Sequence, residues 1–162
     1  MAKEAKDIKT NAMRILDSER VAYRIHTYTC EAFHDGLSIA RMLGQDPDIS
    51  YKTLVAKGKS GDYFVFVIPV AEELDLKAAA RAAGEKSVQM LPLARLTEVT
   101  GYIRGACSPI GMKKSLPTFV EETAQLFDVI TFSGGKRGLQ LVCAPDELLR
   151  ITGGAYAALT VS

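Results

Sequence analysis

The sequence is poor in the residues that build metal centres and disulfide frameworks. It contains three cysteines, Cys30, Cys107 and Cys143, and two histidines, His26 and His34. An odd number of widely spaced cysteines fits neither a zinc ribbon nor a thioredoxin-type pair. Two histidines add little to a possible structural zinc site. We therefore expect reduced thiols, as in a cytoplasmic protein, and no bound metal.

Long apolar segments and a strong net charge are also missing. The longest apolar run, residues 63–71, is half the roughly 18 residues that a membrane helix requires. The N-terminal residues lack the apolar stretch of a signal peptide. The 20 Lys and Arg residues nearly balance the 19 Asp and Glu residues, for a formal net charge of +1. We expect a soluble cytoplasmic protein, away from membranes, whose contacts with nucleic acid are local.

Motifs for nucleotide cofactors are absent as well. The glycine-rich stretch 133–138 (SGGKRG) lacks the spacing of a Walker A loop, and no Gly-x-Gly-x-x-Gly follows a strand. The paired carboxylates Glu72-Glu73 and Glu121-Glu122 are sequence neighbours that face apart on a helix or strand, so we interpret both pairs as solvated. No cofactor is expected.

The chain, of 162 residues, shows no linker, repeat or charge block, so we predict a single domain spanning residues 1–162. Apolar periodicity predicts helices at 8–16 (capped by Thr10 or Asp7), 36–43, 74–83, 93–100 and 146–151. Strands are predicted at 21–28, 51–56, 62–70, 87–90, 127–132, 139–143 and 156–161. Hairpins are expected around 57–61 and 133–138.

The predicted elements indicate a fold class. Strands outnumber helices and are largely joined by hairpins, which favours an α+β domain over a doubly wound α/β fold. We expect a mixed β-sheet rolled towards a barrel, with flanking helices. Residues 63–68 are apolar on both faces, which is typical of a central strand covered from two sides.

Lys52 belongs to the first of three stretches that contain more charged, glycine or other non-core residues than packing of the fold requires. It lies between apolar neighbours in the middle of a predicted strand. Its ammonium group either reaches water along the strand surface or serves as a point charge for a phosphate or carboxylate.

The second stretch, residues 105–111 (GACSPIG), has two glycines and a proline and must be a loop. It is either an ordinary crossover or a backbone that approaches a ligand and offers free N–H groups to it. Cys107 could be a nucleophile only in an electropositive setting, which Lys113 and Lys114 could supply.

The third stretch is the turn at 133–138. It is either a hairpin turn with solvated Lys136 and Arg137 side chains or a small anion nest with two cations. Taken on their own, the residues indicate an α+β domain with a pocket that accepts an anion.

Eight short motifs occur in a characteristic order: TNAMRIL (10–16), YKTLV (51–55), VIPV (67–70), LDLK (74–77), GEK (84–86), TGY (100–102), RGACSPIGMKK (104–114) and SGGKRGL (133–139). Together they resemble the YbaK/EbsC family of free-standing aminoacyl-tRNA editing proteins, relatives of the insertion domain of bacterial prolyl-tRNA synthetases. The resemblance runs from about residue 10 to the C-terminus and is greatest to the YbaK branch, whose members deacylate Cys-tRNA(Pro).

The resemblance implies a mixed sheet rolled into a barrel-like core and a set of site residues. The family's lysine corresponds to Lys52, and its Gly-x-x-x-Pro loop to Gly105 and Pro109. Cys107 falls on a variable position of that loop, which weakens its interpretation as a nucleophile. Tyr28 and Ser133 match two further family site residues.

Neighbours of these motif residues complete the predicted site. Ser108 joins Lys52, Gly105 and Pro109 as catalytic, and the predicted substrate-binding residues are Tyr28, Thr53, Ser133, Gly134, Gly135 and Arg137. The stretch 29–35 does not align cleanly, so the aromatic residue that the family uses near its pocket is either Phe33 or missing.

The resemblance further implies a hydrolase that deacylates mischarged Cys-tRNA(Pro), assisted by the thiol of the substrate's own cysteine. Lys52 would hold the terminal phosphate or ribose, and N–H groups of the 105–109 loop would steady the oxyanion. Mischarged tRNA and prolyl-tRNA synthetase are the implied partners. Two alternatives stay open: a deacylase of Ala-tRNA or another small aminoacyl-tRNA that uses bound water, and a non-catalytic module that binds an aminoacyl or nucleotide group.

Overall fold

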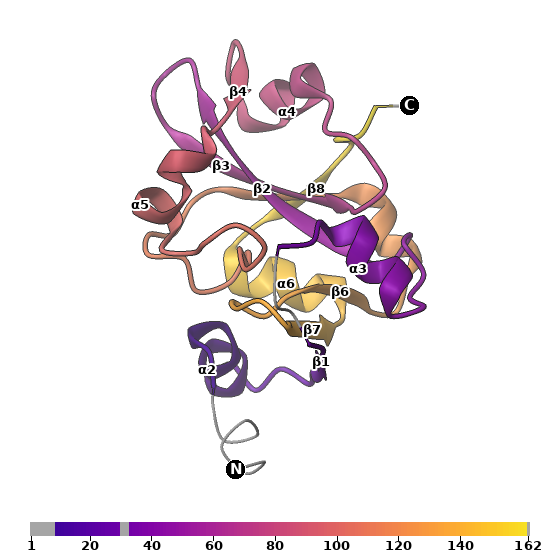
Figure 1. Ribbon diagram of the computed structural model, residues 1–162. Coiled ribbons are helices and arrows are strands. Elements are labelled where there is room, and N and C mark those ends of the chain that lie inside the picture. The colour runs from indigo at the N-terminus through magenta and orange to yellow at the C-terminus, as the bar shows by residue number, and fades with distance from the viewer. Residues whose placement is uncertain (1–8, 30–32, 162) are drawn as a thin grey trace.

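The computed structural model describes residues 9–29 and 33–161 and contains two β-sheets with helices packed around them (Figure 1). The strands are β1 (Arg24–Thr27), β2 (Tyr51–Gly58), β3 (Tyr63–Pro69), β4 (Val88–Met90), β5 (Thr118–Glu121), β6 (Ile130–Ser133), β7 (Leu139–Cys143) and β8 (Ala155–Ala157). The helices are α2 (Asn11–Ser18), α3 (Gly36–Met42), α4 (Leu76–Ala83), α5 (Leu96–Thr100) and α6 (Pro145–Thr152), with 3-10 turns η1 (Leu93–Arg95) and η2 (Glu122–Leu126). Cys30 and Asp7 lie outside the described residues.

The larger sheet is mixed and has β3 at its centre. Its strand order is β4-β2-β3-β5-β8; β2 and β3 form the predicted antiparallel hairpin, whereas β5 runs parallel to β3 and β8 parallel to β5. Val65 and Val67 of β3 pack into one apolar cluster with α2, α6 and the smaller sheet, and Phe66 and Ile68 pack into a second cluster with α4. The prediction of a central strand covered from two sides is confirmed.

The smaller sheet is antiparallel, with the order β1-β7-β6, and its β6–β7 hairpin matches the predicted one. The two sheets meet at a bridge between Ser50 and Thr131. Within the described part of the chain they do not close into a barrel; the predicted α+β domain with a mixed sheet and flanking helices is confirmed. The edge strands are short: β1 has four residues and β8 three, fewer than the strands predicted at 21–28 and 156–161.

Helix ends follow the side chains at their caps. Thr10, not Asp7, caps α2, because its hydroxyl accepts a hydrogen bond from the Met13 N–H. Helix α4 begins two residues later than predicted, because Asp75 caps it by accepting from the N–H groups of Lys77 and Ala78.

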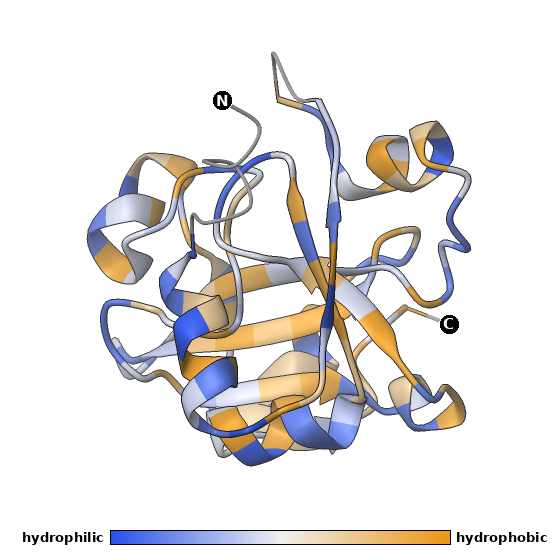
Figure 2. Ribbon diagram, turned by 90° about the horizontal axis from the view of Figure 1, so that it is seen from below, coloured by the Kyte–Doolittle hydropathy of each residue, from blue (hydrophilic) through white to orange (hydrophobic). Residues whose placement is uncertain are grey.

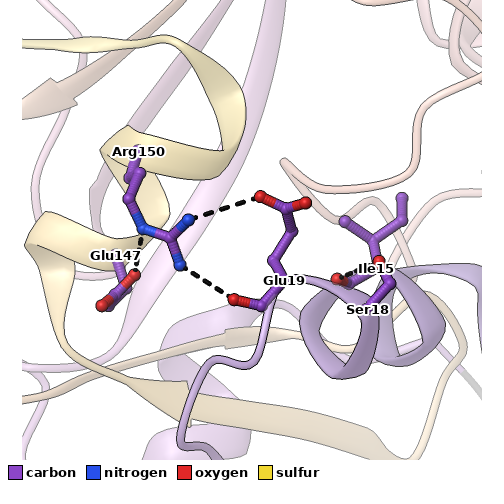
Figure 3. A network of polar contacts seen from close by, with 5 residues as sticks. All are labelled: Ile15, Ser18, Glu19, Glu147 and Arg150. Atoms are coloured by element: carbon purple, nitrogen blue, oxygen red, sulfur yellow. Dashed lines mark hydrogen bonds and ion pairs between the residues drawn. The ribbon is translucent and has the colours of Figure 1, made fainter.

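An ion-pair network joins α2 to α6 (Figure 3). Arg150 donates to a Glu147 carboxylate oxygen at 2.7 Å, and to the side chain and backbone carbonyl of Glu19 at 3.3 and 3.1 Å. These groups are about half exposed, and such pairs are worth about 1 kcal/mol or less. Apolar packing of Leu16 and Leu148 therefore does more to hold the two helices together.

Figure 2 shows the apolar residues gathered along the central strands. No helix in the described ranges has the length and apolar character of a membrane span.

Glu121 corrects one expectation. Its carboxylate is buried, with 3% of the residue exposed, and accepts hydrogen bonds from the N–H groups of Thr123 at 2.8 Å and Leu159 at 2.9 Å. These two donors compensate for the lost hydration. Glu121 thus fixes the C-terminal segment to β5, while Glu122, Glu72 and Glu73 are exposed as expected.

Candidate active site

The site lies along an open edge of β2. On one side, residues 51–57 of β2 pair with β3. On the other side, β4 pairs only with residues 56–58, and Ser50 forms the bridge to the smaller sheet. Residues 52–54 therefore have no strand partner on that side, and unpaired edge groups are available to a ligand.

A cavity of about 310 Å³ opens beside this edge. Its polar lining includes Tyr28, Lys52, Thr53, Ser133 and the Gly105 backbone, while its apolar lining includes Leu54, Met90, Leu91, Leu93 and Leu96. The structure therefore brings together five of the residues predicted from the sequence, which come from β2, β6, the 105–111 loop and the position directly after β1. An apolar chamber with a few polar groups is the usual form of a small-ligand site.

Lys52 is half-buried at this cavity. Burial lowers its pKa below the ordinary 10.5, while the negative charges of Asp35, Glu73 and Glu72 act in the opposite direction. No carboxylate in the described ranges lies within ion-pair distance of its ammonium group. Of the two interpretations made from the sequence, a cation held at a pocket fits this position better than one spread over an open strand surface.

Thr53 follows Lys52 and points to the opposite face of β2, as successive strand residues do. Both residues line the cavity because it extends along the open edge of the strand. The Thr53 hydroxyl oxygen is buried and has no hydrogen-bond partner among the described residues. A buried hydroxyl without a partner is costly, which makes a ligand the natural candidate for its partner.

The 105–111 loop brings backbone close to the cavity. Gly105 has a φ of +86°, and a Cβ there would lie 3.1 Å from both Phe33 and Arg137, so both the conformation and the space favour glycine. Tyr102 holds the loop by donating to the Ile110 carbonyl at 2.6 Å.

The N–H groups along this loop differ in their availability. That of Ala106 donates to the Ile103 carbonyl. Those of Gly105 and Cys107 have no acceptor among the described residues. The backbone at Gly105 and Cys107 therefore has the donors that the sequence interpretation assigned to an oxyanion.

Two predicted catalytic residues lie away from the cavity lining. Ser108 is completely buried, and its hydroxyl accepts a hydrogen bond from the Ile110 N–H at 3.3 Å. Pro109 has no N–H and borders a separate, smaller cavity instead. Their position makes them supports of the loop conformation, because the loop residues that border the site are Gly105 and Cys107.

Cys107 lines the cavity as a protonated thiol. Burial raises its pKa to about 12, so the thiolate fraction near pH 7 is on the order of 10⁻⁵. Burial likewise raises the pKa of Cys143 to about 12. Burial thus opposes the lowered pKa that a nucleophilic cysteine needs. In the described part of the chain, no group of three or more His, Cys, Asp or Glu side chains is placed to hold a metal ion.

The turn at 133–138 serves mainly to shape the backbone. Ser133 lines the cavity and accepts a hydrogen bond from the Gly135 N–H at 3.2 Å. Gly134 and Gly135 are not among the residues that line the cavity. They are required by the turn itself, because a Cβ on Gly134 would lie 2.7 Å from Leu139 and Gly135 has a φ of +103°. Arg137 lies beside the cavity, where its Nε donates to the Arg104 carbonyl at 2.9 Å.

Sequence reasoning missed His34, Asp35 and Arg104, which also line the cavity, and left Phe33 as an alternative. The structure places Phe33 in the lining, with the guanidinium carbon of Arg104 3.8 Å from its ring centroid. One local signal was present: the run of Phe33, His34 and Asp35 directly precedes a helix, and Asp35 caps α3 by accepting from the Ser38 N–H.

Comparisons with known proteins identify the family of the chain. The family model for the aminoacyl-tRNA editing domain matches residues 30–151, and the chain belongs to this family. An Enterococcus faecalis protein named "Putative Cys-tRNA(Pro)/Cys-tRNA(Cys) deacylase EbsC" is 45% identical over 161 residues, which cover 99% of this chain and 98% of that protein. The resemblance seen in the motifs is confirmed.

Solved structures show the same fold at low identity. A crystal structure of a hypothetical protein has a TM-score of 0.85 at 20% identity, covering 94% of this chain and all of the other. A crystal structure titled as "a putative trans-editing enzyme for prolyl tRNA synthetase" has a TM-score of 0.80 at 22% identity, with coverage of 96% and 100%. The α+β class with mixed and antiparallel sheets is thereby confirmed.

Proposed function

We propose that the protein is a trans-editing hydrolase that deacylates mischarged Cys-tRNA(Pro). The observation that carries the proposal is the cavity at the open edge of β2, where a half-buried cation and an unpartnered hydroxyl border an apolar chamber. The Gly105 and Cys107 N–H groups of the loop that also borders it have no acceptor among the described residues. The 45% identity to a relative named as a Cys-tRNA deacylase supports this substrate class.

The reaction needs positioning more than a strong protein base, because the aminoacyl ester is already activated. The substrate's cysteine thiol attacks its own carbonyl carbon, and the C–S bond forms as the ester C–O bond to the tRNA ribose breaks. The thiol proton goes to the departing ribose oxygen through solvent. The cyclic thiolactone released in this way then takes up water to give free cysteine. A free thiol, with a pKa of ~8.5, is a few per cent ionised at pH 7 and far more nucleophilic than a hydroxyl.

The residues of the chain have distinct parts in this scheme. The loop N–H groups at Gly105 and Cys107 stabilise the oxyanion that develops on the carbonyl. Lys52 holds the terminal phosphate or ribose, and Thr53 and Ser133 orient the aminoacyl group. Cys107 remains protonated and takes no covalent part, because burial raises its pKa to about 12.

The substrate also indicates where and with what the protein works. Aminoacyl-tRNAs are made and used in the cytoplasm, so we assign the reaction to that compartment. A protein with a net charge of +1 has little long-range attraction for a polyanion. We therefore propose that prolyl-tRNA synthetase presents the mischarged tRNA and supplies part of the affinity.

The test compares Cys-, Ser- and Ala-tRNA(Pro) with the same purified protein. The proposal predicts fast release from Cys-tRNA(Pro) and slow release from Ser-tRNA(Pro), since serine has nearly the same size but its hydroxyl stays protonated. A deacylase that uses bound water would select by fit, where small steric differences are worth about 1–3 kcal/mol. Fast hydrolysis of Ala-tRNA(Pro) would contradict the thiol mechanism, and binding without hydrolysis of all three would identify a non-catalytic module.

A further inference from the structure

Arg104, Phe33 and Arg137 form a continuous cluster at the rim of the cavity. The guanidinium carbons of Arg104 and Arg137 lie 3.8 and 5.6 Å from the centroid of the Phe33 ring, within cation–π range. Arg104 lines the cavity and is also exposed to solvent, so the cluster lies where the cavity opens.

Neither arginine of the cluster forms an ion pair with a carboxylate of the described residues; the ion pairs there involve Lys9, Arg95 and Arg150. Lys52 adds a third cation at the cavity, and Asp35 is the only carboxylate among the described residues that line it. In a chain whose net charge is only +1, this local excess indicates a binding partner with more than one negative charge.

The geometry leaves these guanidinium groups able to bind phosphate. Stacking on an aromatic ring uses the face of a guanidinium and leaves its N–H edge free for a bidentate contact. Arg137 uses its Nε for the Arg104 carbonyl, so its two terminal nitrogens remain available. The Phe33 ring and the Arg104 guanidinium, whose carbon lies 3.8 Å from the ring centroid, are also groups of the kind on which unpaired bases stack.

Cavity size places the phosphates outside the cavity. At about 310 Å³ the cavity is at the lower end of ligand pockets, which span roughly 300–1,000 Å³. It has room for an aminoacyl group and the adjoining ribose, whereas the preceding nucleotides of a tRNA must remain outside. They would leave the cavity at the opening where Arg104 and Arg137 lie.

We propose that Arg104, Arg137 and Phe33 bind the single-stranded 3′ end of the substrate tRNA. The two guanidinium groups hold its last phosphates, and the Arg104–Phe33 stack supports an unpaired base. This inference rests on the proposed function, because it takes the substrate to be a tRNA with its aminoacyl end in the cavity.

The test measures binding of uncharged RNA, so that it does not depend on the ester chemistry. The probes are a fluorescent hairpin that copies an acceptor stem with a 3′ ACCA overhang, and the same hairpin without the overhang. Wild type should bind the overhang hairpin more tightly. Arg104→Gln and Arg137→Gln should each weaken that binding roughly tenfold to a hundredfold and leave binding of the blunt hairpin unchanged. Arg24→Gln, on the exposed face of β1, is the matched control and should bind both hairpins as wild type does.

Two further measurements separate contact with RNA from mere support of the fold. Removing one arginine–phosphate interaction should lower the slope of log affinity against log salt by about 0.7 for single-stranded RNA. Arg137→Lys keeps the charge without the planar fork, so it should recover part of the affinity and most of the salt slope. Thermal melting identifies any variant that no longer folds, and a purely structural role would leave the salt slope of folded variants unchanged.

The outcomes distinguish this inference from the proposed function. Equal or undetectable binding of the two hairpins by wild type would overturn the inference, as would folded arginine variants that bind the overhang like wild type. If the overhang is recognised but Cys-tRNA(Pro) is not hydrolysed, the inference holds and the proposed function fails. If Cys-tRNA(Pro) is hydrolysed and the arginine variants bind the overhang hairpin like wild type, the proposed function holds and the inference fails.

Discussion

The Thr53 hydroxyl allows a test in which stability and activity change in opposite directions. In the free protein this oxygen is buried and has no hydrogen-bond partner, and a buried polar group in that state costs about 1–3 kcal/mol. Thr53→Val replaces it with a methyl group of nearly the same shape, in a strand that favours β-branched residues. We expect the free energy of unfolding to rise by about 1 kcal/mol, which raises Tm by roughly 2–4 °C in a domain of this size.

Activity should fall in the same variant. Thr53 lines the cavity, where a bound ligand can supply the hydrogen-bond partner that its hydroxyl lacks in the free protein. Loss of one neutral hydrogen bond is worth about 0.5–1.5 kcal/mol, so kcat/KM for Cys-tRNA(Pro) should decrease roughly twofold to tenfold. Single-turnover deacylation and thermal melting of the same preparation measure both effects.

Thr118→Val is the matched control. Thr118 is also a buried strand threonine, 4% exposed, but its hydroxyl donates to the Leu116 carbonyl at 3.0 Å and lies outside the site. Its removal should lower stability by about 1 kcal/mol and leave kcat/KM unchanged. A lower Tm for Thr53→Val would show that its hydroxyl has a partner in the folded protein, and an unchanged kcat/KM would refute its contact with substrate.

Substitutions at three further positions test the remaining assignments. Lys52→Ala should reduce kcat/KM roughly tenfold to a hundredfold, because it removes a charge-assisted hydrogen bond to the substrate. In wild type, burial lowers the pKa of Lys52 below 10.5, so between the lowered pKa and 10.5 the unfolded chain binds more protons than the folded chain. Denaturant titrations should therefore show that the free energy of unfolding rises with pH in this range. The rise should be smaller in Lys52→Met, which has no ammonium group. Cys107→Ala should keep kcat/KM within a few-fold, and a decrease equal to that of Lys52→Ala would restore a protein nucleophile. Gly105→Ala should sharply reduce kcat/KM, because φ is +86° and its Cβ would lie 3.1 Å from Phe33; wild-type rates would show that the loop can relax.

Local pattern predicted the elements whose signals are local. Thr10 caps the first described helix as its sequence position indicated, and the doubly apolar run 63–68 forms the central strand. Strand β5 was missed because its pairing is with β3, where Thr118 lies opposite Val65, and Pro117 before it interrupts any alternation. A short parallel strand depends on partners that are distant in sequence, so it has little local signature.

Distance along the chain also explains the error at Glu121. One of its two N–H donors, Leu159, lies 38 residues away, so the sequence around Glu121 does not indicate that contact. The same applies at the site. Lys52 and Gly105 could be predicted from motifs, whereas Arg104 became a candidate only when the fold placed its guanidinium over Phe33.

The site places two functions of a nearly neutral protein in different regions: contact with the aminoacyl group inside the cavity, and attraction of a polyanion at its opening. An apolar cavity beside an unpaired strand edge excludes water and strengthens the few polar contacts within it. The cations are at or beside its opening, where Arg104 and Arg137 have no carboxylate partner in the described ranges. Charge concentrated at one opening attracts a polyanion within about a Debye length, roughly 8 Å at physiological salt, and has little influence beyond it. Such a protein would hold the tip of a tRNA without competing for its body, which leaves the rest of the molecule accessible to a synthetase.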